Sequence, residues 1–395
     1  MAALEYWLWL SAAPVSPRAK AELLSRFGDP DAAFYSAPGS FRGIQGISPL
    51  EASILERRDR STVGRIRDDC EEQGLQIISL QDAAYPNRLR HIFAPPVVLY
   101  AKGKFPAMDE NAPIAVIGTR RASAYGLRMG RDLAYQIARC GGIVVSGLTR
   151  GIDAEAAKGA LLADGCCAAV LGTPHEQEHG YLAKDVAARG VVLSEYPPGT
   201  EAQRSFFRER NRIAAGISVG VVVVEAPARS GTRLFAEEAA EQGKELFAVP
   251  GCVNDENSEG TLAMLKDGAK LVTCGWDIMS EFQGLYPGKI HPAGNDPAPM
   301  PQPVSEAVEQ PQAEKPIDKE SGEDYSDLEK QLSGLSEIQL QIIAAIDRNS
   351  SHIDDIVEAT GLPVGKVLGN LTRLEVMGFV RREAGKRVTL KIAKK

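Results

Sequence analysis

Short apolar runs alternate with longer amphipathic stretches between residues 113 and 278. The runs are rich in β-branched side chains and fall at 114–117, 143–145, 168–171, 191–193, 219–224 and 246–249. Such near-continuous runs are typical of parallel strands buried on both faces. The stretches between them have helical apolar spacing, as at 125–139, 154–163 and 232–242. This order predicts an α/β fold with a doubly wound, mostly parallel sheet and right-handed crossovers.

The pattern is helical on both sides of this region. Residues 1–80 predict a small helical domain. Residues 331–395 predict three short helices, at 340–346, 353–359 and 364–375, and then two strands, at 378–380 and 388–390, which is typical of a winged helix. A Gly-rich turn at 43–47 suits either a helix-hairpin-helix contact with DNA or packing within a bundle, and both interpretations stay open. We therefore expect four parts: 1–80, a core with an extended lead-in at 81–290, a linker at 291–330, and 331–395.

The net charge of −7 comes from the expected linker. Residues 291–330 contain ten acidic and three basic residues, so this segment alone carries −7 and the rest of the chain is neutral. The segment is rich in proline and poor in large apolar residues, so it lacks the surface to form a core. The acidic balance of the whole chain therefore does not exclude a nucleic-acid partner.

Nothing in the composition indicates export, a membrane or a metal. The six cysteines form no C-x-x-C pair and are expected to be reduced thiols of a cytoplasmic protein. The apolar residues 6–10 are too few to span a membrane, and no basic residue precedes them as in a secretory signal. His175 and His179 have the spacing of helical metal ligands, but Pro174 and Gly180 flank them and predict a loop.

Three turns rich in small residues follow predicted strands and open predicted helices. They read Gly-Thr-Arg-Arg-Ala-Ser at 118–123, Ser-Gly-Leu-Thr-Arg-Gly-Ile-Asp at 146–153 and Ser-Gly-Thr-Arg at 230–233. In a parallel sheet these turns emerge at the same edge, where helix N-termini favour anions. The segment 208–212, Arg-Glu-Arg-Asn-Arg, adds more arginines. Arginines on several separate loops suit a chain of phosphates better than a single nucleotide.

The candidate nucleic-acid-binding residues are small residues that let the backbone approach a phosphate, and polar or basic residues beside them. They are Gly118, Thr119, Arg120, Ser123, Ser146, Gly147, Arg150, Gly151, Arg210, Asn211, Arg212, Ser230, Gly231 and Thr232. Of these, Arg120, Arg210 and Arg212 are expected to neutralise phosphates. A wider trail adds Arg121, Arg204, Arg208, Arg229 and Arg233. Phe206 and Phe207 are candidates to stack on a base, with core packing expected for one of the two.

These motifs together resemble the DprA/Smf family of DNA-processing proteins. The resemblance runs from Tyr85-Pro86 through 117–126, 146–153, 194–197, Phe-x-x-Arg-Asn-Arg-Ile at 207–213 and Ser-Gly-Thr at 230–232 to Gly268-Ala269. It implies a Rossmann-like core that binds single-stranded DNA, an N-terminal SAM/helix-hairpin-helix-like domain and a C-terminal winged helix. It also implies a homodimer that loads the recombinase RecA in homologous recombination and natural transformation. No cofactor and no catalytic residue are implied.

The sequence departs from the family pattern at several positions. Ala157 stands where the family usually has His, Leu262 where Asn is common and Arg208 where Pro is usual. The loop at 172–181 lacks the usual Tyr-Pro. These differences indicate a divergent member and concern the contacts of the pocket more than the fold.

Two other functions share this predicted architecture. A nucleotide phosphoribohydrolase would need a carboxylate where this chain has Phe235; Glu225 is the substitute, although capping the next turn is its more ordinary role. A nucleotide sensor would use the same pocket but would need only two or three arginines. A dehydrogenase is disfavoured because no G-x-G-x-x-G follows 114–117, and a serine hydrolase because no G-x-S-x-G occurs.

Overall fold

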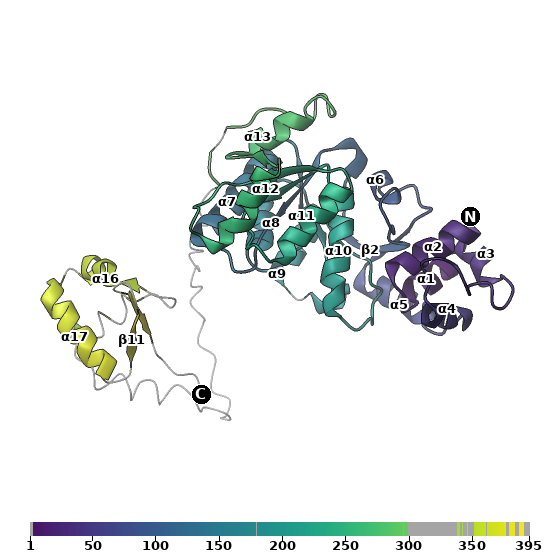
Figure 1. The fold of residues 1–395 in the computed structure, drawn as a ribbon, viewed down its shortest axis with the longest axis horizontal. Helices are drawn as coiled ribbons and strands as arrows, with labels where there is room; N and C mark the ends of the chain where they lie inside the picture. The colour runs from purple at the N-terminus through teal and green to yellow at the C-terminus, as the bar shows by residue number, and fades with distance from the viewer. Residues whose placement is uncertain are drawn as a thin grey trace, which may run out of the picture. The chain divides into compact units, whose positions relative to one another are not determined.

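The protein is described here from a computed structural model. It describes residues 3–178, 180–294 and 296–298, and in the C-terminal part residues 338–339, 342, 346, 351–360, 362–376, 379–383 and 387–390. The chain forms two compact units, 1–304 and 305–395 (Figure 1). No helix in the described ranges is long and apolar enough to cross a membrane.

A nine-stranded sheet runs through the first unit in the order β1-β2-β6-β5-β4-β3-β7-β8-β9. Its strands are β1 (Gln76–Ser79), β2 (Val98–Gly103), β3 (Pro113–Ile117), β4 (Ile143–Ser146), β5 (Cys167–Val170), β6 (Val191–Ser194), β7 (Gly220–Val223), β8 (Glu245–Ala248) and β9 (Lys270–Leu271). Neighbouring strands are parallel throughout the part of the sheet that runs β6-β5-β4-β3-β7-β8-β9. By contrast, β2 is antiparallel to both of its neighbours, β1 and β6. The predicted doubly wound, mostly parallel sheet is confirmed.

Helices cover both faces of the sheet (Figure 1). One layer packs α7 (Ala124–Arg139), α8 (Ile152–Leu162), α9 (Tyr181–Arg189) and α13 (Gly275–Met279). The other packs α6 (Asn87–Arg90), α10 (Arg204–Ile217), α11 (Gly231–Glu241) and α12 (Glu259–Lys266). On β3, Ile114 and Val116 face the first layer, and Ala115 and Ile117 face the second. This explains the uninterrupted apolar runs, since both faces of each central strand are buried.

The N-terminal helical domain packs against one end of the sheet. It consists of α1 (Leu4–Ala12), α2 (Pro17–Phe27), α3 (Pro30–Phe34), α4 (Pro49–Glu56) and α5 (Val63–Gln73). Its core is continuous with Val98 and Tyr100 of β2, and Ser11 Oγ hydrogen-bonds Tyr100 Oη at 3.1 Å. The helical prediction for 1–80 is wrong at its end, where β1 joins the sheet. Four residues are too few to show a strand period, and pairing with distant β2 decides their structure.

The Gly-rich turn at 43–47 leads into α4, whose N-terminus already holds a carboxylate. Ser48 and Glu51 form a capping box, and the backbone N–H groups of Ser16 and Ser48 each donate to Glu51 at 2.9 Å. A DNA phosphate at this helix end would have to displace Glu51. The structure therefore favours the packing interpretation of the turn.

The second unit contains the winged-helix elements. They are α16 (Ile353–Thr360), α17 (Val364–Val376) and a three-stranded sheet of β10 (Ser351–His352), β12 (Arg387–Leu390) and β11 (Val380–Glu383). The helices predicted at 353–359 and 364–375 and the strand predicted at 388–390 are confirmed. The strand predicted at 378–380 begins only at Val380, and β10 was not predicted. Most of the helix predicted at 340–346, and the expected linker after residue 298, lie outside the described residues.

Candidate nucleic-acid interface

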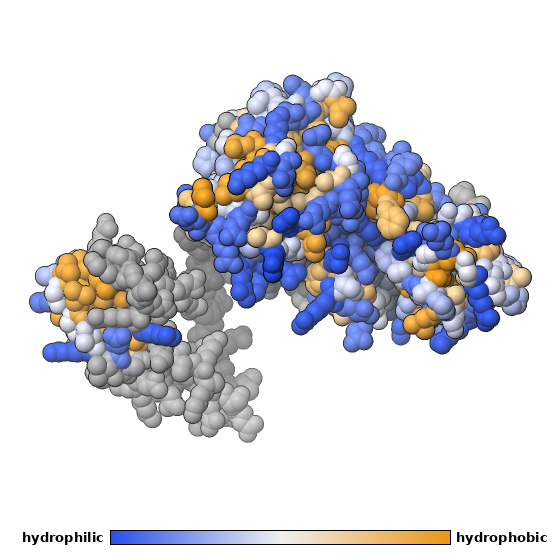
Figure 2. All heavy atoms as spheres, in the orientation of Figure 1, coloured by the Kyte–Doolittle hydropathy of each residue, from blue (hydrophilic) through white to orange (hydrophobic). Residues whose placement is uncertain are grey.

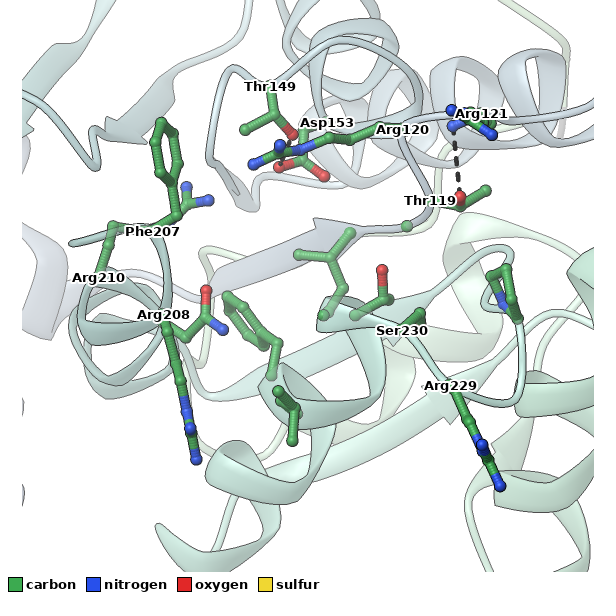
Figure 3. A pocket seen from close by; sticks show the side chains of 18 of the residues that line it. Thr119, Arg120, Arg121, Thr149, Asp153, Phe207, Arg208, Arg210, Arg229 and Ser230 are labelled. Atoms are coloured by element: carbon green, nitrogen blue, oxygen red, sulfur yellow. Dashed lines mark hydrogen bonds between the residues drawn. The ribbon is translucent and has the colours of Figure 1, made fainter. Parts of the chain in front are cut away.

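A pocket of about 520 Å³ opens at the carboxyl edge of the sheet, where strand order reverses around β3 and β7 (Figure 3). Ligands of open α/β sheets bind at such a switch point. Its walls come from the turns after β3 and β7, the loop before α8, and α10. The lining residues are Ile117, Gly118, Thr119, Arg120, Arg121, Thr149, Asp153, Arg204, Phe207, Arg208, Arg210, Asn211, Pro227, Arg229, Ser230, Gly231, Thr232, Leu234 and Phe235.

Arg210 is a buried cation in the wall of this pocket. Its side chain comes from α10, only 6% of the residue is exposed, and Nη1 donates to the Val170 carbonyl at 2.8 Å. Among the described residues, no carboxylate lies within ion-pair distance of it and its Nε has no hydrogen-bond partner. Burial lowers the pKa of this guanidinium, which nonetheless stays charged at neutral pH. Such a group is stabilised by an anion that enters the pocket.

Gly147 and Gly151 support the pocket without lining it. A Cβ on Gly147 would lie 1.8 Å from Arg210 Nη1, so glycine leaves the room that the guanidinium occupies. Gly151 has a φ of +93°, and a Cβ there would meet the Thr119 carbonyl at 2.5 Å. A side chain at Gly147 would thus displace the arginine and one at Gly151 would displace the neighbouring turn, and neither glycine lines the pocket.

Asp153 is a pocket residue absent from the predicted set. Only 5% of it is exposed, and it accepts a hydrogen bond from Thr149 Oγ1 at 3.0 Å. Burial raises the pKa of its carboxyl, and the charges of Arg210 and Arg120 oppose that shift. Figure 3 shows Arg120 extending over Asp153. Asp153 belongs to the Gly-Ile-Asp motif, so the sequence already singled out its position. The sequence alone did not show that its carboxylate faces the arginines.

Six arginines are among the residues that line the pocket. Besides buried Arg210, they are Arg120, Arg121, Arg204, Arg208 and Arg229, all exposed. They come from three separate segments, the turn after β3, α10 and the turn after β7. In Figure 3, Arg208 and Arg229 extend from opposite walls and point away from the pocket. The positive charge therefore continues beyond the pocket on both of these walls.

The two adjacent phenylalanines have different environments. Phe206 stacks on Tyr196, with ring centroids 3.8 Å apart and an interplanar angle of 12°. Phe207 lines the pocket, and the Arg120 guanidinium lies 5.1 Å from its ring centroid. Core packing thus applies to Phe206, and Phe207 is the ring available to a base.

The predicted residues of the turns after β3 and β7 meet at the pocket as expected. Gly118, Thr119 and Arg120 face Ser230, Gly231 and Thr232, which open α11. A Cβ on Gly231 would meet nothing within 4 Å, so this position faces open space. Together with Arg210 and Asn211, eight of the predicted residues line one pocket.

Three other predicted residues do not line the pocket. Ser123 caps α7 by accepting from the Gly126 N–H at 3.0 Å. Ser146 is buried and donates to the Asp153 carbonyl at 2.7 Å, which fixes the loop that carries Asp153. Arg150 is exposed beside the pocket. The first two shape the turns. Their contact with DNA stays a prediction.

The structure corrects the expectation for Arg212. This side chain is buried on another face of α10, and its Nη2 donates to both carboxylate oxygens of Glu195 at 2.6 Å. Arg210 and Arg212 are two residues apart on a helix, so their side chains point in different directions. Arg212 is therefore committed to a buried ion pair and is not available to a phosphate.

The structure also places the residues on which a phosphoribohydrolase activity or a metal site would depend. Phe235 lines the pocket where a phosphoribohydrolase would need a carboxylate. Glu225 accepts from the Ser123 N–H at 2.9 Å and from its hydroxyl, which is the capping role expected for it. His175 Nε2 pairs with the Tyr100 carbonyl at 2.8 Å, and His179 lies outside the described residues.

Comparison with known proteins places these features in a family. The family model described as DNA recombination-mediator protein A matches residues 76–283, and that of the DprA winged helix domain matches residues 327–386. Protein Smf of Synechocystis is 29% identical, over 97% of this chain and 97% of its own length. The putative DNA processing protein DprA of Mycobacterium tuberculosis is 33% identical, over 94% of each chain.

A solved structure agrees with the fold. The X-ray structure of DNA processing protein A (DprA) from Streptococcus pneumoniae is 30% identical, with a TM-score of 0.61, and the match covers 71% of this chain and 99% of that one. The family models, the relatives of similar length and this structure agree with one another and with the motifs around the pocket. The chain belongs to the DprA/Smf family of DNA-processing, recombination-mediator proteins.

Proposed function

We propose that this protein binds single-stranded DNA along the pocket edge of its sheet and mediates DNA recombination. The observation that carries the proposal is the buried Arg210, which has no ion-pair partner among the described residues and shares its pocket with five more arginines. A sensor of one small nucleotide would need two or three of these arginines. Six on three segments suit several successive phosphates.

The depth of Arg210 favours a single strand over a duplex. With 6% of the residue exposed, its guanidinium is reached only by a group that enters the pocket. An unpaired nucleotide has the freedom to turn inward, whereas duplex phosphates lie on a regular outer surface. The exposed arginines would then hold neighbouring phosphates, and the ring of Phe207 would stack on a base once Arg120 turns from it to a phosphate.

Recombination mediation would follow from this binding without bond-making chemistry. In our proposal the bound strand is handed to a recombinase of the RecA type, and two copies of the chain extend the strand site. Membership of the DprA/Smf family supports this role, including a role in natural transformation. Phe235 at the position where a hydrolase needs a carboxylate supports a role without catalysis.

Fluorescence anisotropy with labelled single-stranded and duplex oligonucleotides tests the binding proposal. We expect tight single-strand binding, weaker duplex binding, and loss of single-strand affinity in Arg120→Ala. Arg139→Ala is the matched control, because Arg139 is exposed at the far end of α7. Equal affinity for duplex and single strand, or an unaffected Arg120→Ala, would contradict the proposed site.

Recombinase loading needs a separate assay. RecA-driven strand exchange on single strands pre-coated with single-strand-binding protein should speed up when this protein is added. Sedimentation equilibrium should show a dimer. No acceleration would contradict the loading role and leave the strand-binding result to stand by itself.

A further inference from the structure

An exposed tyrosine lies at the same edge of the sheet as the pocket. Tyr125 is the second residue of α7 and stands four residues after Arg121, which lines the pocket. Its hydroxyl donates to the Pro250 carbonyl at 3.0 Å. Pro250 follows β8, and β7 lies between β3 and β8 in the sheet. Tyr125 therefore spans the carboxyl edge from the turn after β3 to the turn after β8, outside the pocket itself.

This hydrogen bond makes the tyrosine ring a fixed surface that is open to solvent. The residue is 44% exposed although its hydroxyl is held. Partial burial, together with the charge of Glu225, raises the pKa of the hydroxyl, so it stays protonated and keeps donating at neutral pH. An aromatic side chain with two torsions, one end tethered, loses little entropy when a partner binds. Such rings are the surfaces on which unpaired bases stack.

Two exposed arginines flank this ring along the chain. Arg121 precedes α7, and Arg128 lies three residues after Tyr125, on the same face of the helix. Within the part of the chain that the structure describes, Arg128 has no ion-pair partner. A base stacked on Tyr125 would thus have a cation on each side for the phosphates that precede and follow it.

The turn after β8 favours a contact through the base rather than through phosphates alone. Asn257 Nδ2 donates to the Arg121 carbonyl at 3.2 Å, and Asp255 accepts from the Asn257 N–H at 2.9 Å. Asp255 and the exposed Glu256 therefore bring negative charge to this side of Arg121. Carboxylates repel phosphates but leave the stacking of an uncharged base unaffected, so the phosphates are expected on the side of α7.

We propose that Tyr125 is a second base-stacking site for the single strand, outside the pocket. The inference rests on the proposed function and extends it, because the ring of Phe207 would take one base inside the pocket and the ring of Tyr125 another beyond it. Figure 3 shows Arg121 and Arg229 at the end of the pocket away from Phe207, so a strand that leaves at this end passes Arg121 and then reaches Tyr125. An oligonucleotide that only fills the pocket does not reach this ring.

A length series separates the two stacking sites. Dissociation constants of labelled oligothymidylates of about 3 to about 20 nucleotides are measured by anisotropy, a range that brackets the site sizes of single-strand binders. Tyr125→Leu should weaken binding of the long strands about 5- to 150-fold, the range for the loss of one stacked base, and leave the shortest unchanged. Tyr125→Phe keeps the ring and should keep most of the affinity. Tyr181→Leu is the matched control, since Tyr181 is 84% exposed and begins α9 without lining the pocket.

Photocrosslinking locates the base on the wild-type protein without any variant. Long strands that carry 5-iodouracil at successive positions are bound, irradiated and digested with trypsin, which cleaves after Arg121 and Arg128. We expect an adduct on the peptide 122–128 with long strands, and none on it with the shortest. Thermal melts show whether the variants are folded.

The outcomes distinguish failure of this inference from failure of the proposed function. Equal affinity of the wild type and Tyr125→Leu for long strands, an equal loss in Tyr125→Phe, or no adduct on the peptide 122–128 at any position would overturn the inference alone. The same loss for the shortest and the longest strands in Tyr125→Leu would also overturn it, because the ring would then act on the pocket. Absence of strand binding by the wild type at low salt would overturn the proposed function and this inference together.

Discussion

At the scale of the residue, burial separates arginines that look alike in the sequence. Arg210 and Arg212 both belong to the Arg-Asn-Arg motif, yet one lines the pocket and the other pairs with Glu195. The motif predicted the position of Arg210 because the helix begins at the same sheet edge as the Gly-rich turns. It could not reveal the role of Arg212, since Glu195 is distant in the chain and only the fold brings the two together.

Replacing Arg210 with alanine should weaken single-strand binding by about ten- to hundredfold, the range of a lost hydrogen bond between charged groups. Among the described residues no carboxylate lies within ion-pair distance of Arg210, but its charge favours the ionised form of buried Asp153, so Arg210→Ala should also raise the pKa of that carboxyl. Binding isotherms of Arg210→Ala and of Arg139→Ala at equal salt measure the difference. Equal affinities would show that the buried cation does not contact the strand.

Two glycines of the predicted set should respond differently to alanine. Gly147→Ala forces Arg210 aside and should lower both strand affinity and the free energy of unfolding, the latter by about 1–3 kcal/mol as in overpacked cores. Gly231→Ala places its methyl in open space and should leave stability unchanged. Denaturant unfolding together with anisotropy distinguishes them. A stable Gly147→Ala with normal binding would contradict the packing described for Arg210.

At the scale of the element, the sequence predicts helices of several turns and strands buried on both faces. It does not predict the short strands β1 and β9. The helices at 125–139 and 232–242 show an apolar stripe, and β7 shows a run buried on both sides. β1 and β9 have four and two residues, so no period exists to read. Their structure depends on pairing with β2 and β8, which only the tertiary fold supplies.

The capping box of α4 makes the stability of the N-terminal helical domain depend on pH in the acidic range. Although partial burial opposes it, hydrogen bonds from Ser16 and Ser48 lower the pKa of Glu51 to about 2. A folded-state pKa below the unfolded value of about 4.5 means that this stabilisation is complete above that value. It is lost as pH falls through about 2.

Thermal unfolding of the wild type and Glu51→Gln over this acidic range should therefore diverge. The glutamine variant should be less stable near neutral pH, and the difference should shrink as the solution becomes more acidic. A constant difference at every pH would mean that the ionised carboxylate of Glu51 does not stabilise the helix end.

At the scale of the whole molecule, the first unit combines a sheet switch point, a buried cation and two flanking walls that carry exposed arginines. Figure 2 shows that hydrophilic side chains cover most of the visible face of this unit, with apolar residues in small separate patches. The net charge of the chain hides this arrangement because ten acidic residues are concentrated in 291–330. Local charge, rather than total charge, is what a nucleic-acid strand meets.

The salt dependence of single-strand binding tests the phosphate-binding edge most directly. Each neutralised phosphate of a single strand contributes about −0.7 to the slope of log affinity against log salt. We expect a steep linear fall for the wild type, a slope shallower by about 0.7 for Arg208→Ala, and an unchanged slope for Arg139→Ala. An affinity that is independent of salt, or the same slope in all three proteins, would contradict a strand bound through its phosphates at this edge.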